Sequence, residues 1–104
     1  MTNITVNELK LFLLEKENFR LIDVREKWEL DIAKIEKSIE LPLSNILNNY
    51  SKLNLDIEYA VICHSGVRSM QASSFLENKG YSVSNVIGGI DQWSLEIDPA
   101  LDRY

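Results

Sequence analysis

The only cysteine of the chain, Cys63, lies in a setting that favours nucleophilic chemistry. It directly follows the apolar run 59–62, and residues 68–79 after it are predicted to form a helix that ends at Gly80. An ordinary thiol, with a pKa near 8.5, is only about 3% ionised at neutral pH. A helix N-terminus, converging backbone N–H groups and a nearby guanidinium all stabilise the anion. The pattern therefore predicts a sulfur nucleophile at the base of a small anion-binding loop.

The residues that follow the cysteine have the composition of such a loop. Gly66 provides the backbone freedom that lets the chain curl around Cys63. Arg68 stands where the predicted helix begins, so its guanidinium can close the loop or hold an anionic substrate. A buried structural cysteine at a strand end is the common alternative, but the polar, turn-like sequence with its arginine favours the reactive interpretation. The predicted binding loop comprises His64, Ser65, Gly66, Val67, Arg68 and Ser69.

Hydrophobic periodicity and turn residues indicate the elements that must position this loop. The first helix has a complete start signal, because Thr5 and Glu8 have capping-box spacing and Ile4 with Leu9 can form a hydrophobic staple. Ser44 is expected to cap a helix in the middle of the chain. The remaining expected helices are 6–16, 26–32, 68–79 and 90–95, and the expected strands are 19–25, 38–42, 58–62 and 84–87.

Strands that alternate with helices predict an α/β fold with a mostly parallel sheet covered on both faces. Ligands bind beyond the carboxyl ends of the strands in such sheets. Asp23 and Cys63 both fall at strand ends on the same edge. The 104 residues are expected to form one domain, 1–104, in which 98–104 is an extended C-terminal tail. The sequence therefore places the chemistry at one edge of the sheet.

Composition excludes several classes of function. A net charge of −5 and a pI near 4.8, without a basic cluster, argue against nucleic acid. No apolar run approaches the roughly 18 residues of a membrane span, and the N-terminus lacks a secretory signal. One cysteine excludes an internal disulfide. With a single histidine besides it, no metal site and no cofactor are expected. A cytoplasmic protein is the simplest expectation.

Loop length separates two chemistries that use a cysteine and an arginine in this way. Protein tyrosine phosphatases and related enzymes place five residues between the two. Here only four intervene, from His64 to Val67. A shorter loop encloses a smaller volume, which suits a single bound sulfur atom better than a tetrahedral phosphoryl group.

Three segments together resemble the rhodanese-like family of sulfurtransferases over most of the chain. These are Leu-Ile-Asp-Val-Arg-Glu at 21–26, the loop 63–68 followed by Ser69, and Gly-Gly-Ile-Asp-Gln-Trp at 88–93. They stand in the family's order and at its separations. The resemblance implies a three-layer fold with a five-stranded central sheet. One departure is the segment 34–38, Lys-Ile-Glu-Lys-Ser, where the family often has His-Ile-Pro-Gly-Ala; it concerns a turn that does not hold the nucleophile.

The resemblance also implies a mechanism. Cys63 would take a sulfane sulfur from a small donor such as thiosulfate, carry it as a persulfide, and pass it to an acceptor, which can be a protein. The lone cysteine fits, because no second thiol in the chain can displace the sulfur as a disulfide. Two alternatives remain open at this point: a non-catalytic interaction module on the same fold, and a cysteine-dependent phosphatase or arsenate reductase. The sequence names neither the physiological donor nor the acceptor.

Other side chains near the predicted site have less specific roles. Asp23 and Arg25 can help to position the loop, but a structural pair that bonds backbone at the strand end is favoured. His64 is expected to line the rim and influence substrate choice, since no carboxylate orients it as a base. Ser65 and Ser69 can donate hydrogen bonds to the persulfide or the loop, and Ser69 can equally cap the helix. In the remaining aromatic positions, Trp28 is expected to pack or cover the mouth, and Trp93 to anchor the last helix.

Overall fold

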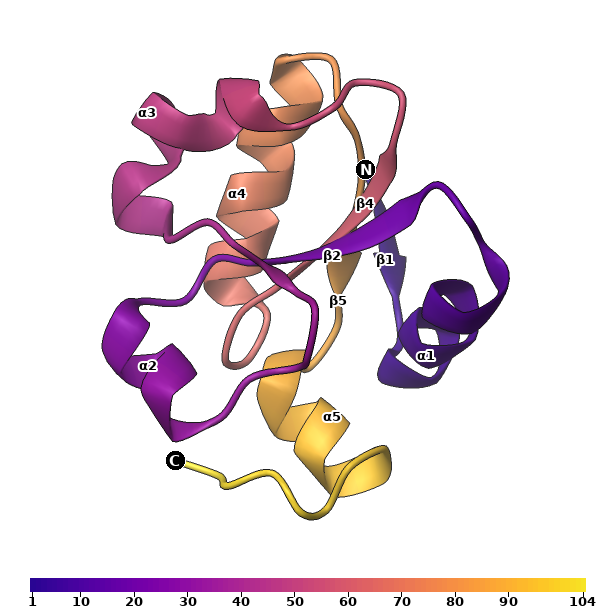
Figure 1. Ribbon diagram of the computed structural model, residues 1–104, viewed down its shortest axis with the longest axis vertical. Coiled ribbons are helices and arrows are strands. Elements are labelled where there is room, and N and C mark those ends of the chain that lie inside the picture. The colour runs from indigo at the N-terminus through magenta and orange to yellow at the C-terminus, as the bar shows by residue number, and fades with distance from the viewer.

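Five parallel strands form the central sheet of the computed structural model, which describes residues 1–104 (Figure 1). The central strand of the sheet is apolar after its first residue, as expected for a parallel strand that is buried on both faces. The strand order is β1-β5-β4-β2-β3, with β1 at Thr2–Ile4, β2 at Phe19–Asp23, β3 at Ile39–Glu40, β4 at Glu58–Ile62 and β5 at Ser82–Val86. The predicted α/β fold class is therefore confirmed.

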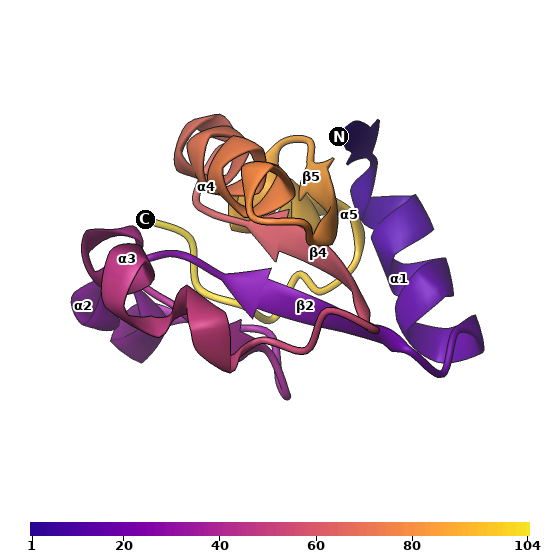
Figure 2. The same ribbon diagram turned by 90° about the horizontal axis from the view of Figure 1, so that it is seen from above.

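Helices cover both faces of this sheet (Figure 2). One face carries α1 and α5, and the other carries α3 and α4. The short helix α2 follows β2 and lies near the carboxyl edge, beside the end of the chain (Figure 1). The helix bounds are Val6–Glu15 for α1, Lys27–Ile32 for α2, Ile46–Asn49 for α3, Val67–Asn78 for α4 and Gly89–Glu96 for α5. None of the helices has the length and apolar character needed to cross a membrane.

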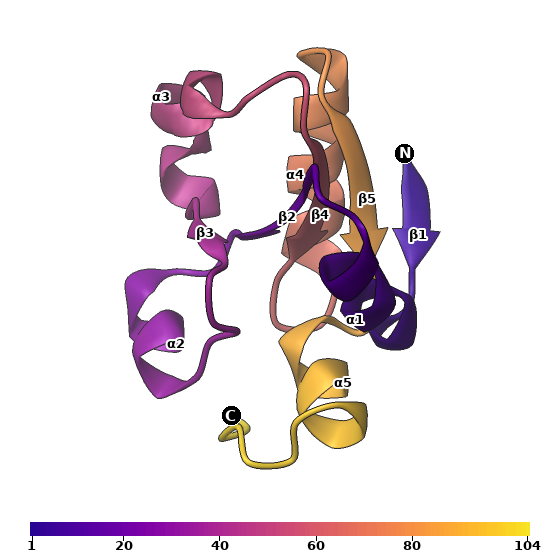
Figure 3. The ribbon, with the colours of Figure 1, turned by 45° about the vertical axis from the view of Figure 1, so that its right-hand side comes forward.

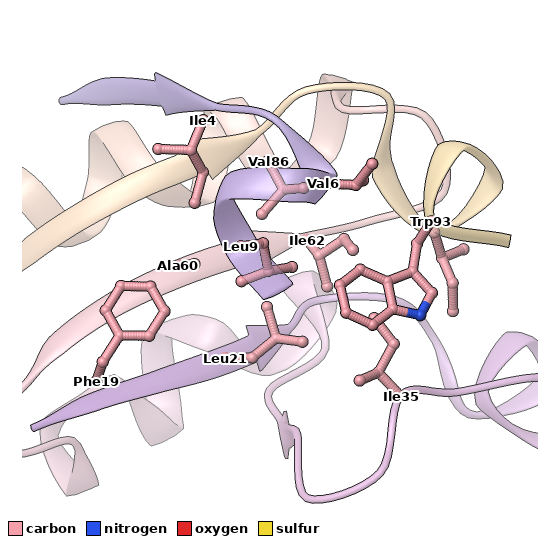
Figure 4. Packing of buried hydrophobic residues seen from close by; sticks show 11 residues of the cluster. Ile4, Val6, Leu9, Phe19, Leu21, Ile35, Ala60, Ile62, Val86 and Trp93 are labelled. Carbon is pink, nitrogen blue, oxygen red and sulfur yellow. The ribbon is translucent and has the colours of Figure 1, made fainter. Parts of the chain in front are cut away.

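Alternation along β4 divides the buried side chains into two cores. Ala60 and Ile62 face α1 and α5, whereas Tyr59 and Val61 face α3 and α4, because successive strand residues point to opposite faces. Figure 4 shows the first core, in which Trp93 of α5 packs beside Ile62. Trp93 therefore anchors the last helix, as expected. Full burial of each such side chain contributes about 1.5–3 kcal/mol.

The N-terminal start signal is confirmed, and it has a structural role that the sequence pattern did not reveal. Glu8 N donates to Thr5 Oγ1 at 3.1 Å, and Thr5 N donates to Glu8 Oε1 at 3.0 Å. Ile4 and Leu9 are buried in the same core. The residues before the cap form β1, which pairs with β5 along the sheet edge (Figure 3). This strand was not predicted, because three residues are too few for an alternation to be recognised.

Two further expectations need correction. Ser44 does not cap a helix; its hydroxyl donates to the Glu26 carboxylate at 2.8 Å instead. The segment around it splits into α3 and two single 3₁₀ turns, Leu43–Asn45 and Tyr50–Lys52. The strands expected at 19–25, 38–42 and 84–87 instead span Phe19–Asp23, Ile39–Glu40 and Ser82–Val86. The strand differences lie at element ends, where boundaries are least well defined.

Candidate active site

Cys63 lies at the carboxyl end of β4, and the chain closes over its side chain before α4 begins. The residue is only 1% exposed. Gly66 N donates a hydrogen bond to its Sγ at 3.0 Å. This N–H can turn back toward the sulfur because Gly66 has φ +114°, in the left-handed region that favours glycine. The first N–H groups of α4, which follows at once, have no partner within the helix and add positive potential at the loop.

The segment that begins at Gly88 and Gly89 contacts the backbone of the same loop. Ile90 N donates to the carbonyl oxygen of Cys63 at 2.8 Å, and Asp91 N donates to that of His64 at 3.2 Å. A Cβ atom added at Gly89 would collide with both carbonyl groups. The N-terminus of α5 thus holds the backbone of the cysteine loop, which gives a physical reason for a glycine at position 89, the first residue of this helix.

Arg68 makes an ion pair that the sequence analysis missed. Its Nη1 and Nη2 each donate to Glu29 at 2.6 Å, in a bidentate arrangement. Glu29 is 2% exposed. The two hydrogen bonds from Arg68 lower the pKa of Glu29 to about 2, and the carboxylate in turn raises the pKa of Arg68. Much of the positive charge expected to meet an anionic substrate is therefore balanced by a fixed carboxylate.

Glu29 had one recognisable signal in the sequence. It stands three residues after Glu26, and Glu26 N donates to Glu29 Oε2 at 2.9 Å at the start of α2. This spacing predicts a local helix start. It carries no information about a partner 39 residues further along the chain.

Asp23 and Arg25 form a second ion pair, which is fully buried. Arg25 N and Nε donate to Asp23 Oδ1, both at 3.0 Å, and Nη2 donates to Oδ2 at 2.9 Å. Nη2 also donates to the carbonyl oxygen of Ala33 at 2.7 Å, and Nη1 to that of Glu29 at 3.3 Å. The pair thus joins the end of β2 to the middle of α2 and to its C-cap. It positions Glu29, and neither member contacts the Cys63 sulfur.

The C-terminal tail, residues 98–104, returns to the site. Its last residue, Tyr104, stacks on the ring of His64 with centroids 4.2 Å apart, and meets the Trp28 ring edge-on at 5.8 Å. Tyr104 Oη donates to Glu29 Oε1 at 2.8 Å and accepts from Arg25 Nη1 at 3.0 Å. Burial raises the pKa of Tyr104. The tail has no regular structure, but it covers the rim that His64 and Trp28 form.

Three of the loop residues, Ser65 to Val67, line an open cavity that Cys63 itself does not reach. Ser65 and Val67 are exposed, and Ser69 is buried behind the sulfur. The cavity has a volume of about 300 Å³ and is lined by Asn3, Ser65, Gly66, Val67, Met70, Asn85, Ile87 and Gly88. No group of three or more His, Cys, Asp or Glu side chains is placed to hold a metal ion. The arrangement presents one buried thiol with a backbone donor at Gly66, an ion pair between Arg68 and Glu29, and a neighbouring open cavity.

A family model of the rhodanese-like domain matches residues 5–96. The chain belongs to the rhodanese-like domain family. Among solved structures, a rhodanese-related protein from Thermoplasma volcanium superimposes with a TM-score of 0.88 at 34% identity, covering 98% of this chain and 100% of the other. A rhodanese-like domain protein from Staphylococcus aureus gives a TM-score of 0.86 at 33% identity, covering 100% and 99%.

Sequence relatives place this rhodanese-like domain among sulfurtransferases in general. A protein named sulfurtransferase from Allochromatium vinosum is 34% identical over 83 residues, which cover 79% of this chain and 78% of that protein. Other relatives are much longer. An adenylyltransferase and sulfurtransferase of Ogataea parapolymorpha is 39% identical over 87 residues, and these span 81% of this chain but 22% of that protein. Sulfurtransferase activity is thus the class of function that the comparisons support.

Proposed function

We propose that this rhodanese-like domain transfers a sulfane sulfur through a persulfide on Cys63. The observation that carries the proposal is the cysteine loop itself: Sγ receives the Gly66 N–H at 3.0 Å and lies beside the N-terminus of α4. These groups stabilise negative charge on sulfur, whether on the thiolate or on the outer atom of a persulfide. The Gly66 N–H and the N-terminus of α4 thus stabilise this negative charge without direct contact between the sulfur and a charged side chain.

The first half-reaction transfers one sulfur atom to the enzyme. The Cys63 thiolate attacks the outer sulfur of thiosulfate, an S–S bond forms to Sγ, and the S–S bond of thiosulfate breaks with its electron pair. Sulfite leaves, and the enzyme holds Cys63–S–S⁻. No proton is consumed. The four-residue interval between Cys63 and Arg68 favours this small product over a cysteinyl phosphate.

The second half-reaction returns the enzyme to its starting state. An acceptor thiolate or cyanide attacks the outer sulfur of the persulfide, and the Cys63 thiolate is the leaving group. Because the chain has one cysteine, no internal thiol competes for this sulfur. A relative from Bacillus subtilis that is named a putative sulfur carrier protein supports a protein acceptor. A reduced working thiol also fits the cytoplasm, where we place the protein.

The proposal is tested by incubating the reduced protein with thiosulfate and recording the intact mass. We expect a gain of one sulfur atom, lost again on addition of cyanide or a small thiol. Cys63→Ser is the matched control and should show no gain. An unchanged wild-type mass, or an equal gain in the variant, would refute the persulfide. Hydrolysis of an aryl phosphate that depends on Cys63 would instead favour the phosphatase alternative.

A further inference from the structure

Behind Cys63 a row of uncharged polar side chains runs to the edge of the sheet. Cys63 Sγ lies 3.3 Å from Ser69 Oγ, which lies 2.5 Å from Asn85 Oδ1. Asn85 Nδ2 donates to Asn3 Oδ1 at 3.3 Å. Ser69 and Asn85 are 0% and 2% exposed, whereas Asn3 is exposed on β1. The row thus connects the buried sulfur with solvent through α4, β5 and β1.

The serine in this row has one proton and two neighbours that can receive it. While Cys63 is a thiol, its S–H donates to Ser69 Oγ, and the Ser69 O–H donates to Asn85 Oδ1. When Cys63 becomes an anion, its sulfur can accept a second hydrogen bond besides the one from Gly66 N, and Ser69 is the neighbour that can donate it. Ser69 can turn its O–H to the sulfur only if Asn85 no longer requires that hydrogen bond, because a buried oxygen without a partner is costly.

An amide side chain can meet this requirement without gaining or losing a proton. A half-turn of the Asn85 amide exchanges Oδ1 and Nδ2, so that an N–H then donates to Ser69 Oγ. Asn85 Oδ1 would then face Asn3, whose amide can turn in the same way to offer its own N–H. Asn3 borders the 300 Å³ cavity, so water can also supply this last donor. Every hydrogen bond in the row is thereby reversed.

We propose that Asn85 is a positioning residue for the nucleophile: reversal of the Asn85–Asn3 amide pair frees the Ser69 hydroxyl to donate to the anionic sulfur of Cys63. The proposal deepens the proposed function, since it concerns the thiolate and persulfide that this function requires. Asn85 acts through Ser69, whose hydroxyl lies between its Oδ1 and the sulfur.

The charged groups around Cys63 are separate from this row. Arg68 is paired with Glu29, Asp23 with Arg25, and Asp91 with Arg103, and His64 stacks on Tyr104. The strands β1 and β5 contain no titratable side chain, and the amino group of Met1 pairs with Glu77. Substitutions at Asn85 and Asn3 therefore leave the neighbouring ion pairs in place.

The test compares two Asn85 variants by the pH dependence of Cys63 alkylation with iodoacetamide, a small uncharged reagent. In Asn85→Asp the carboxylate only accepts, so it retains the Ser69 O–H and adds negative charge. We expect the midpoint of the alkylation profile to rise by about one pH unit or more, which is roughly a tenfold slower reaction below the midpoint. In Asn85→Leu no acceptor competes for the hydroxyl, and the midpoint should not rise. Equal shifts in both variants would overturn the proposal.

A second pair of variants keeps the proposal falsifiable if the buried substitutions prevent folding. Asn3 is exposed, so Asn3→Asp and Asn3→Ala should both fold, as circular dichroism can verify. The carboxylate introduced by Asn3→Asp cannot donate to Asn85 Oδ1, and the midpoint should rise, whereas Asn3→Ala leaves room for water and should not change it. The rise should persist at about 1 M salt, where the Debye length is near 3 Å. Equal midpoints, or a rise that salt abolishes, would refute the proposed reversal of the Asn85–Asn3 hydrogen bonds.

These measurements use no sulfur donor, so they are independent of the persulfide assay. If the alkylation profile shifts as expected but no persulfide forms, the role of Asn85 is supported and the proposed activity is rejected. If the persulfide forms but the alkylation profiles of all four variants are identical, the proposed activity is supported and the role of Asn85 is rejected.

Discussion

Replacing Glu29 by Gln removes the negative charge that faces Arg68 while it preserves the size of the side chain. The amide keeps an oxygen for the guanidinium, but the bidentate ion pair with its two 2.6 Å hydrogen bonds is lost. Glu29 is 2% exposed, so water has little access to the carboxylate side of the pair, whereas the Arg68 side chain is 33% exposed and stays partly hydrated. We expect this variant to be markedly less stable near neutral pH and to approach the wild type as the solution becomes acidic.

The size of the effect follows from the pKa of Glu29, which Arg68 lowers from 4.5 to about 2. At about 1.4 kcal/mol per pKa unit, this shift contributes about 3 kcal/mol to the free energy of unfolding at neutral pH. The folded-state pKa is the depressed one, so the contribution is complete above 4.5 and is lost as the pH falls toward 2. At about pH 3, roughly 1 kcal/mol should remain.

Denaturant unfolding of wild type and Glu29→Gln at pH 7 and pH 3 measures both differences. In thermal unfolding, the loss at pH 7 corresponds to a decrease in Tm of roughly 10–20 °C for a domain of this size. Asp31→Asn on the same helix is the matched control. Its pair with Lys27 is exposed, and such pairs contribute less than about 1 kcal/mol. A stability difference between wild type and Glu29→Gln that does not shrink at pH 3 would refute the electrostatic explanation.

Three further changes test how the site is supported. Gly89→Ala should lower the free energy of unfolding in denaturant by about 3 kcal/mol or more, because its Cβ meets the carbonyl groups of the cysteine loop. Gly80→Ala is the control, since only its left-handed φ of +95° disfavours a side chain, and it should lower this free energy by about 1–2 kcal/mol. Asp23→Asn should cost about 3–5 kcal/mol, because it leaves a buried guanidinium without its counter-charge; a loss below about 1 kcal/mol would contradict this. Tyr104→Ala should uncover His64 and speed alkylation of the cysteine by bulky reagents more than by iodoacetamide, and equal ratios would show that the tail does not limit access.

Much of the fold and of the cysteine loop could be predicted because both depend on local rules. The capping box of Thr5 and Glu8, the apolar strand before Cys63 and the glycine that closes α4 each act within a few residues. The parallel sheet followed from the alternation of strands with helices. Errors arose where an element was too short to show a period, as at β1, or where Ser44 had a nearby carboxylate that competed with the helix cap.

The sequence by itself determined the proposed nucleophile, the length of its loop, and the absence of a second thiol in these 104 residues. Only the tertiary structure decided which carboxylate balances the charge of the arginine in this loop and which residues cover the loop. Arg68 meets Glu29 across 39 residues, Tyr104 reaches Glu29 across 75, and Asn85 meets Asn3 across 82. These contacts depend on the path of the folded chain and have no spacing that a one-dimensional pattern can show. The residues of the proposed cysteine loop are therefore adjacent in the sequence. The residues that set the charge around this loop and the access to it are brought together only by the fold.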